Sequence, residues 1–283
     1  EVFIKEFWYR FYKNKLAFSG FVMLIILLLF ALAAPLIAPY DPYQMNPGAM
    51  LEGPSSEHFF GTDQFGRDIF SRIIYGTRIS FRVGIISVSI ALVIGLIMGV
   101  VAGYYGGWVD GVLSRLMDIM FSFPQILLAL VIMALLGSSL TNVMIAIGIV
   151  YIPIFGRIAR GAVLSIKDSL YIEAAHSMGV SDIVIMWKHV IPNILAPLIV
   201  QTTLSFGFAI RAEAALSFLG LGVEPDVPSW GVMLNMGTNW MESAWWIAIF
   251  PGVAATLAIL SFNVLGDGLR DALDPKLRNE LEG

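Results

Sequence analysis

The chain has 283 residues, of which 58% are hydrophobic and 13% are charged, whereas an ordinary soluble domain is about 45–50% apolar and about 25% charged. So few charged residues cannot cover the surface of a soluble protein of this length, and the composition therefore indicates a polytopic membrane protein. A net charge of −4 without a basic stripe argues against a nucleic-acid partner, and the absence of cysteine excludes disulfides and thiolate metal sites.

Apolar runs free of charge predict six transmembrane helices, because a helix needs about 20 apolar residues to cross the hydrocarbon core of a bilayer. One run is too long for a single span, and we divide it at Gly137–Ser139, where Thr141 and Asn142 can start a new helix. The runs cover residues 16–40, 83–109, 119–156, 190–210 and 243–266, and the span that begins at 190 continues past Arg211 and Glu213 to about residue 219. The sequence thus predicts an all-α protein with six spans.

Lysine and arginine are distributed unequally between the two sides of the predicted membrane. The tails and loops on the side of the termini contain 12 of them, and the opposite side contains 4. Because positively charged loops stay in the cytoplasm, both termini are predicted to be cytoplasmic. The chain then divides into a cytoplasmic tail with the first span (1–40), an extracytoplasmic loop (41–82) and a transmembrane domain (83–283). Within the loop, residues 68–75 are expected to form a short amphipathic helix at the outer interface.

The sequence contains no pattern for catalysis. The dipeptide Gly-Lys does not occur, so the chain has no Walker A loop, and any ATP hydrolysis must belong to another protein. The patterns His-Glu-x-x-His and Gly-x-Ser-x-Gly are also absent, and the three histidines are not at metal-ligand spacing. We therefore expect no catalytic residue, no metal and no cofactor in this chain.

The cytoplasmic stretch 169–193 predicts two short helices joined by a tight turn. Ser169 and Ser181 are typical N-cap residues, and Gly179 suits the left-handed residue that ends a helix. Pro192 is expected to end the second helix, because proline lacks the backbone N–H that a helix interior requires. A compact element of this kind is suited to docking a partner, and a purely structural loop is the alternative.

The same stretch has the order Glu-Ala-Ala, three residues, glycine and a distal proline, which resembles the EAA loop of ABC importer permeases. His189 stands where many members have isoleucine, and this departure resembles the peptide and nickel branch of the family. Segments 61–80, 213–231 and 263–275 also resemble that branch, in its C-type permease subunit. The residues that the resemblance assigns to coupling with ATPase subunits are Glu173, Ala174, Ala175, Gly179, His189 and Pro192.

The resemblance implies a MetI-like permease core with one additional N-terminal span, in the plasma (inner) membrane of a prokaryote. It also implies import of dipeptides or oligopeptides by alternating access, with nickel or a nickel chelate as the alternative substrate. The implied partners are the lipid bilayer, a homologous B-type permease, two cytoplasmic ATPases that bind ATP and Mg, and an extracytoplasmic peptide-binding protein. A self-contained secondary transporter is the alternative of a different class.

Two sets of charged residues leave alternatives open. Arg211 and Glu213 lie in the outer half of the fifth predicted span, where charges usually face the protein interior or a water-filled path. They either line the translocation path or form structural ion pairs. A charged signature in the external loop either holds a capped helix through local ion pairs or contacts the binding protein. Its residues are Asp63, Arg67, Asp68 and Arg72.

Overall fold

The computed structural model describes residue 8 and residues 11–273, and this part of the chain is helical, with an isolated β-bridge between Thr62 and Asp68 in place of any sheet. The α-helices are α2 (Lys15–Leu32), α3 (Ala34–Ile37), α4 (Ile69–Tyr105), α5 (Gly107–Phe121), α6 (Gln125–Leu136), α7 (Leu140–Ile166), α8 (Leu170–Ser177), α9 (Asp182–Ile185), α10 (Leu195–Phe218), α11 (Trp230–Thr238) and α12 (Trp246–Leu273). A π-helical segment (Met186–Val190) and a 3₁₀ segment (Ile191–Ile194) join α9 to α10.

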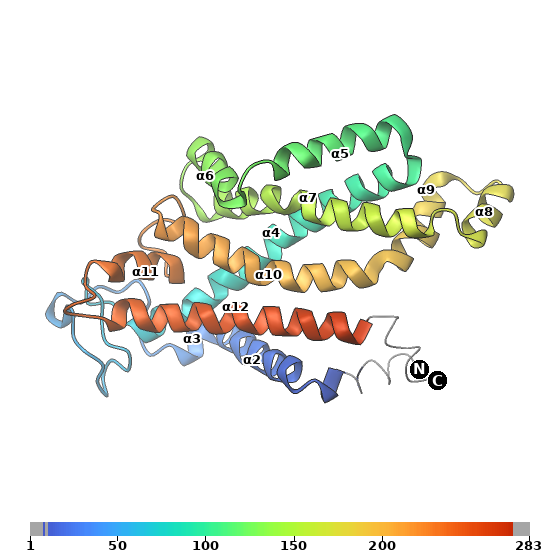
Figure 1. Ribbon diagram of the computed structural model, residues 1–283. Coiled ribbons are helices and arrows are strands. Elements are labelled where there is room, and N and C mark those ends of the chain that lie inside the picture. Colours follow the sequence, from blue (N-terminus) through green and yellow to red (C-terminus); the bar gives the residue numbers. More distant parts are fainter. Residues whose placement is uncertain (1–7, 9–10, 274–283) are drawn as a thin grey trace.

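The helices form one elongated bundle (Figure 1). Helices α2 and α12 pack together along one side, α4, α7 and α10 form the middle, and α5 and α6 cover the opposite side. The α8–α9 hairpin projects at the end of the bundle where α12 also ends, on the side of α7 and away from α12 (Figure 1). At the other end, α11 packs on α10 and α12 beside the long loop that precedes α4. We call these the hairpin end and the loop end.

Among the described residues, five helical stretches are long and apolar enough to cross a membrane, and α5 and α6 together pass as a sixth although they are bent by 90°. The number agrees with the six predicted spans when the bent pair counts as one. The third predicted span is nevertheless not one straight helix, because α6 has only 12 residues, or about 18 Å at 1.5 Å per residue. Pro124 lies at the bend, where it cannot donate a backbone hydrogen bond to the preceding turn.

Helix α4 begins at Ile69 rather than at Val83, so the expectation of a separate interfacial helix at 68–75 is wrong. The Asp68 carboxylate accepts a hydrogen bond from the backbone N–H of Ser71 at 2.7 Å and caps the helix. Of the arginines that suggested a loop, Arg72, Arg78 and Arg82 lie on α4 itself. With 37 residues, α4 is about 56 Å long, which exceeds the hydrocarbon core of about 30 Å, so its ends extend beyond the bilayer.

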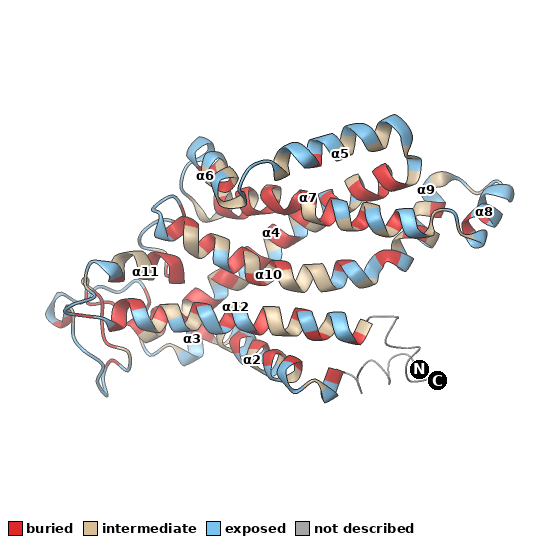
Figure 2. Cartoon of the chain, viewed as in Figure 1, coloured by how far each residue is buried: buried red, intermediate tan, exposed pale blue. Residues whose placement is uncertain are grey.

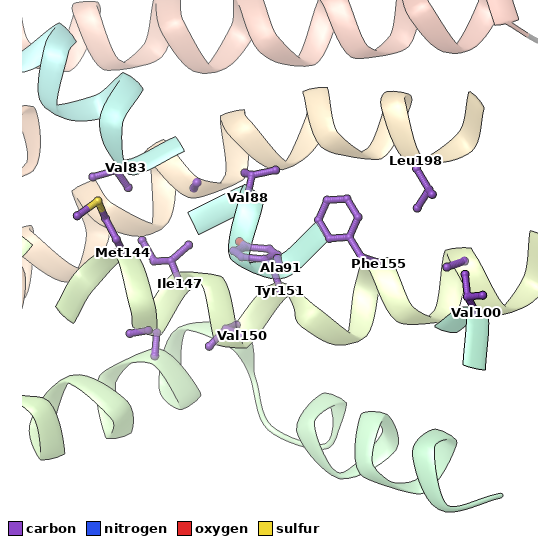
Figure 3. Packing of buried hydrophobic residues seen from close by; sticks show 14 of the residues in the cluster. Val83, Val88, Ala91, Val100, Met144, Ile147, Val150, Tyr151, Phe155 and Leu198 are labelled. Carbon is purple, nitrogen blue, oxygen red and sulfur yellow. The ribbon is translucent and has the colours of Figure 1, made fainter. Parts of the chain in front are cut away.

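The main core lies where α4 crosses α7. Gly95 of α4 lets the two backbones approach, since a Cβ there would lie 2.6 Å from the Ile152 carbonyl oxygen. Apolar side chains fill the remaining space: Val83, Val88, Ala91 and Val100 from α4, Met144, Ile147, Val150, Tyr151 and Phe155 from α7, and Leu198 from α10 (Figure 3). This packing makes α4 and α7 one rigid unit running from the loop end to the hairpin end.

Residues are buried where helices pack together, and an apolar side chain is not buried merely because it is apolar. Buried residues concentrate where α4, α7 and α10 meet, whereas α5 is mostly exposed (Figure 2). Large apolar side chains such as Leu28, Val93 and Leu260 are exposed on the outside. Such a surface suits lipid rather than water, as the mean hydropathy of +0.80 indicates.

Candidate functional site

The predicted turn at the hairpin end is present. Gly179 has φ +74°, the left-handed conformation that the sequence predicts for it. Its backbone N–H donates to the His176 carbonyl at 2.9 Å, and the Val180 N–H donates to the Ala175 carbonyl at 3.1 Å. These bonds satisfy the last carbonyls of α8 and reverse the chain into α9. We refer to residues 169–185 as the α8–α9 hairpin.

The two serines occupy the N-cap positions of α8 and α9, but neither hydroxyl makes the predicted capping bond. The Ser169 hydroxyl is buried and has no hydrogen-bond partner in the described part of the chain. The backbone carbonyl of Ser169 instead accepts hydrogen bonds from the N–H groups of Ile172 and Glu173, at 2.9 and 3.1 Å. The helix starts were therefore predicted at the correct residues, whereas side-chain capping was wrong.

The two alanines of the hairpin face opposite ways. Ala175 is 2% exposed and joins the main core, while Ala174 and Glu173 lie on the exposed face. Leu170 and Met178, which are 83% and 75% exposed, extend that face. Of the two alanines, only Ala174 is therefore accessible to a partner.

Tyr104, near the end of α4, connects to both helices of the hairpin. Its hydroxyl donates to Oδ1 of Asp182 in α9 at 3.0 Å and lies 3.0 Å from Nε2 of His176 in α8. The sequence contains no local signal for this contact, because the partners lie 78 and 72 positions away. The hairpin is thereby fastened to the longest helix of the bundle.

Pro192 does not end the second helix as predicted. The chain remains helical from Asp182 to Phe218, changing to a π-helix before Pro192 and to 3₁₀ geometry around it. Widening of the turn accommodates the proline ring, and the Ile191 N–H bonds to the Met186 carbonyl. The His189 carbonyl accepts a bond from the Asn193 side-chain amide at 2.7 Å. His189 and Pro192 thus shape the joint between the hairpin and α10.

Arg211 lines a cavity of about 250 Å³ between α6, α7 and α10. Its guanidinium lies over the Phe208 ring, 4.9 Å from the ring centroid, and Tyr151 lines the same cavity. Gln125 supplies the remaining polar side chain of the lining, and the other lining residues are Ile126, Ala129, Ile147, Val150, Ala212 and Ala215. Arg211 is exposed at this position.

Glu213 is fully buried on another side of α10. Its Oε1 accepts a hydrogen bond from the Ser217 hydroxyl at 2.8 Å, and Oε2 has no hydrogen-bond partner among the described residues. The Ser229 hydroxyl at the start of α11 is a further polar neighbour of the carboxyl group. Glu213 therefore faces the connection between α10 and α11 and makes no ion pair with Arg211.

The charged signature of the external loop is buried rather than exposed. Asp63, Arg67, Asp68 and Arg72 are each at most 4% exposed. Arg67 Nε donates to Asp63 at 2.7 Å, and His58 Nδ1 lies 2.9 Å from Asp68. Arg72 donates to the Pro42 carbonyl at 2.8 Å. These contacts favour the alternative of local structural pairing over direct contact with a partner.

Tryptophans attach this loop to the helices behind it. The indole N–H of Trp246, at the start of α12, donates to the Thr62 carbonyl at 3.1 Å, and that of Trp230 in α11 donates to the Ile73 carbonyl at 3.2 Å. Residues 38–68, α11 and the starts of α4 and α12 therefore form one packed cap at the loop end. Among the residues that the structure describes, no cluster of His, Asp and Glu side chains could hold a metal ion.

Comparison with known proteins gives consistent matches over the chain. The family model of the binding-protein-dependent transport system inner membrane component matches residues 91–279. The model of the N-terminal TM domain of oligopeptide transport permease C matches residues 3–54. The two matches together include both ends of the bundle.

Several curated relatives are similar over nearly their full length. The chain is 49% identical to the dipeptide transport system permease protein DppC of Alkalihalophilus pseudofirmus, over 94% of this chain and 88% of the relative. It is 44% identical to the di/tripeptide transport system permease protein DppC of Pseudomonas aeruginosa, over 98% and 93%. It is 45% identical to the glutathione transport system permease protein GsiD of Pectobacterium atrosepticum, over 97% and 92%.

A solved structure of the MetNI methionine ABC transporter, in an inward-facing conformation, matches with a TM-score of 0.58 at 19% identity, over 72% of this chain and 96% of that one. This likeness concerns the fold, and with the N-terminal match it confirms the predicted MetI-like core preceded by an additional span. The chain therefore belongs to the family of binding-protein-dependent transport system inner membrane components, the permeases of ABC importers.

Proposed function

We propose that this chain is the permease subunit through which an ABC importer moves short peptides into the cell by alternating access. The observation that carries the proposal is the 49% identity to a dipeptide permease over 94% of the chain. The other relatives described above are named for di- and tripeptides and for glutathione, which is itself a tripeptide. These names favour a peptide over the nickel alternative.

The permease would work with a homologous second permease, two ATPases that bind ATP and Mg, and an extracytoplasmic binding protein. The sequence supports separate ATPases because it lacks a Walker A loop. The purified chain should therefore neither bind nor hydrolyse ATP, whereas the assembled complex should do both. Uptake by the chain alone, without ATP, would instead support a secondary transporter.

The α8–α9 hairpin is the element that would receive motion from an ATPase. Its exposed face carries Leu170, Ala174 and Met178 beside Glu173, a surface of apolar side chains with one carboxylate. A docked element must also be rigid toward the spans, and Tyr104 and the buried Ala175 supply two attachments. Movement of the hairpin would then pass into α4 through Tyr104.

The second route for this movement leads into α10. His189 and Pro192 lie in the continuous helical connection between α9 and α10, where π and 3₁₀ turns replace regular α-helix. Such irregular turns are common at functional hinges. In this proposal the joint lets α10 tilt when the hairpin moves, and α10 carries both Arg211 and Glu213.

Glu213 would serve the loop end rather than the path. Its carboxyl group is fully buried between Ser217 and the start of α11. It would hold the connection between α10 and α11 in place, so that the packed cap follows movements of α10. Asp63, Arg67, Asp68 and Arg72 would hold the cap together from within and leave its exposed surface to the binding protein.

The hairpin end is proposed to be cytoplasmic, together with both termini. The start of α2 and the end of α12 lie at that end, where the Asn14 side-chain amide donates to Asp271 at 3.4 Å. Ser165, near the hairpin, and Glu57, in the cap, are both exposed. In this cysteine-free chain, a cysteine at Glu57 should react with an impermeant thiol reagent in intact cells, and one at Ser165 should not. The reverse labelling pattern would contradict the proposed orientation.

Reconstitution tests the function itself. The chain, its partner permease, the ATPases and the binding protein are placed in vesicles, and labelled dipeptide and nickel are offered separately. ATP-dependent accumulation of the dipeptide is expected. Accumulation of nickel without peptide uptake would contradict the proposal, and uptake of neither substrate by an assembled complex with active ATPases would also contradict it.

A further inference from the structure

The cavity between α6, α7 and α10 has a mostly apolar lining into which Arg211 brings a positive charge. We infer that Arg211 binds the C-terminal carboxylate of a peptide as it crosses the permease. This inference rests on the proposed function, and adds to it a residue and the chemical group that this residue recognises.

The guanidinium is held in place by aromatic side chains. It lies 4.9 Å from the centre of the Phe208 ring, and Phe208 is stacked on Tyr151 at 6.4 Å with an interplanar angle of 6°. Tyr151, on α7, lines the same cavity as Arg211. An arginine has five N–H donors in one plane, and contact of the face of that plane with Phe208 leaves enough donors for both oxygens of a carboxylate.

No anion inside the described chain neutralises Arg211. The cavity lining contains no Asp or Glu, and the ion pairs formed among the described residues do not include Arg211. Arg211 lies seven positions before the end of α10 at Phe218, about 10 Å inside it. A charge at such depth normally pairs or faces a water-filled path, so its anion must come from outside the described part of the chain.

The lining also selects which end of a peptide fits. A cationic amino terminus would be repelled by Arg211 and would find no carboxylate in the cavity, whereas the carboxyl terminus meets three polar side chains: Arg211, Tyr151 and Gln125. The cavity volume of about 250 Å³ is below the roughly 300–1,000 Å³ of sites that enclose a drug-sized ligand. It therefore suits one terminal residue of a peptide, with the apolar wall against its side chain.

The dipeptide, di/tripeptide and glutathione that give the relatives their names all carry a C-terminal carboxylate and a free amino group. Of these two shared groups, only the carboxylate is an anion that an arginine can bind. A carboxylate of the partner permease is the other source of an anion. A permanent pair of that kind would stabilise the complex and would be indifferent to the end group of the peptide. The two sources therefore predict different responses to amidation of the substrate.

The test compares a dipeptide with its C-terminal amide in vesicles containing the complete complex. Arg211→Met keeps an unbranched stem without the charge, and Arg211→Lys keeps the charge without the planar donor pair. Arg78→Met is the matched control, because Arg78 is also exposed and also lies over an aromatic ring, Tyr75 at 5.9 Å, but does not line the cavity. One binding protein serves every variant, so its own preference cancels when acid-to-amide ratios are compared.

Arg211→Met should lower uptake of the dipeptide by about 10- to 100-fold, as expected from loss of hydrogen bonds to a charged group, and should leave uptake of the amide nearly unchanged. Dipeptide uptake by the Arg211→Lys complex should lie between that of the Arg211→Met complex and that of the unmodified complex. The control Arg78→Met should retain the acid-to-amide uptake ratio of the unmodified complex. An unchanged ratio with Arg211→Met would overturn the inference, and absence of peptide uptake by the unmodified complex would instead refute the proposed function.

A second measurement removes delivery by the binding protein. Saturation-transfer NMR with the membrane complex alone, at millimolar dipeptide, should show transfer to the C-terminal residue that disappears with Arg211→Met and persists with Arg78→Met. If Arg211→Met lowers uptake of the dipeptide and of its C-terminal amide equally and also lowers the melting temperature of the complex, Arg211 pairs with the partner permease. That outcome would also overturn the inference.

Discussion

Replacement of Tyr104 by phenylalanine removes a hydroxyl that joins both helices of the α8–α9 hairpin to α4. The ring itself remains, and it keeps its edge-on contact with Tyr105, whose ring centroid lies 5.3 Å away. The change therefore tests the attachment of the hairpin without opening a cavity. If the hairpin transmits motion from an ATPase into α4, this attachment must resist the force that the ATPase applies.

The free energy lost on Tyr104→Phe follows from the two hydrogen bonds of the Tyr104 hydroxyl. Asp182 accepts the tyrosine proton at 3.0 Å, so His176 Nε2 donates to the hydroxyl oxygen at 3.0 Å. A hydrogen bond to a charged group contributes about 1.5–3 kcal/mol and a neutral one about 0.5–1.5 kcal/mol. The His176 and Asp182 side chains are 49% and 42% exposed, so the lower ends of both ranges apply. A loss of about 2 kcal/mol would shift the ratio of attached to detached hairpin about 30-fold.

The assay is the ratio of peptide uptake to ATP hydrolysis in reconstituted vesicles, together with amide hydrogen exchange over residues 170–185. Tyr104→Phe should lower the ratio and speed exchange in the hairpin, while the amount of complex stays normal. Tyr105→Phe is the matched control, because the Tyr105 side chain is 50% exposed and its hydroxyl makes no hydrogen bond among the described residues. Unchanged exchange and an unchanged ratio in Tyr104→Phe would refute the reasoning that this contact transmits motion.

Three further predictions concern the hairpin and the cap. Gly179→Val should weaken co-purification of the ATPases, because a β-branched residue at φ +74° is strained by about 1–3 kcal/mol; Gly179→Asn should be nearly neutral, since asparagine tolerates this conformation and a Cβ there meets no atom within 4 Å. Ala174→Trp should impair ATPase docking at a normal membrane level of the permease, whereas Ala175→Trp should lower the level itself, because overpacking a core position that is 2% exposed costs about 1–3 kcal/mol and occasionally more. Equal effects of the two variants in immunoblots and in co-purification would contradict this division. Arg67→Met leaves the buried Asp63 carboxylate without its ion-pair partner, so the detergent-solubilised permease should lose about 3–5 kcal/mol of stability, and an unchanged melting temperature would contradict the structural role.

Much of the fold could be predicted from the sequence because the signals are local. A bilayer requires long apolar helices, so the runs of apolar residues mark the spans wherever no charge interrupts them. The left-handed turn at Gly179 was predicted because its conformation depends mainly on glycine itself. The order of residues in 169–193 also sufficed to indicate the family of the chain.

The predicted helix boundaries were wrong where the structure accommodates a charged residue or a proline inside a helix. Arg72 suggested a loop, yet it lies on α4, because the Pro42 carbonyl accepts its hydrogen bond and lets the arginine be buried. Pro192 suggested a helix end, yet the helix continues, because a π turn accommodates the ring. A charged residue or a proline therefore predicts a helix boundary only where the folded structure does not accommodate it within the helix.

The tertiary structure decided which candidate site residues are exposed, which are buried and which neighbours each one contacts. Ala174 and Ala175 are identical neighbours in the sequence, and only their packing makes one exposed and the other buried. Arg211 and Glu213 are two positions apart, and the helix turns one toward a cavity and the other toward the start of α11. Composition and local order determine which segments become helices in a membrane, because backbone hydrogen bonding and hydrophobic length act within a segment. The surface on which each side chain lies depends on which helices cross, and that is set by contacts between residues far apart in the chain.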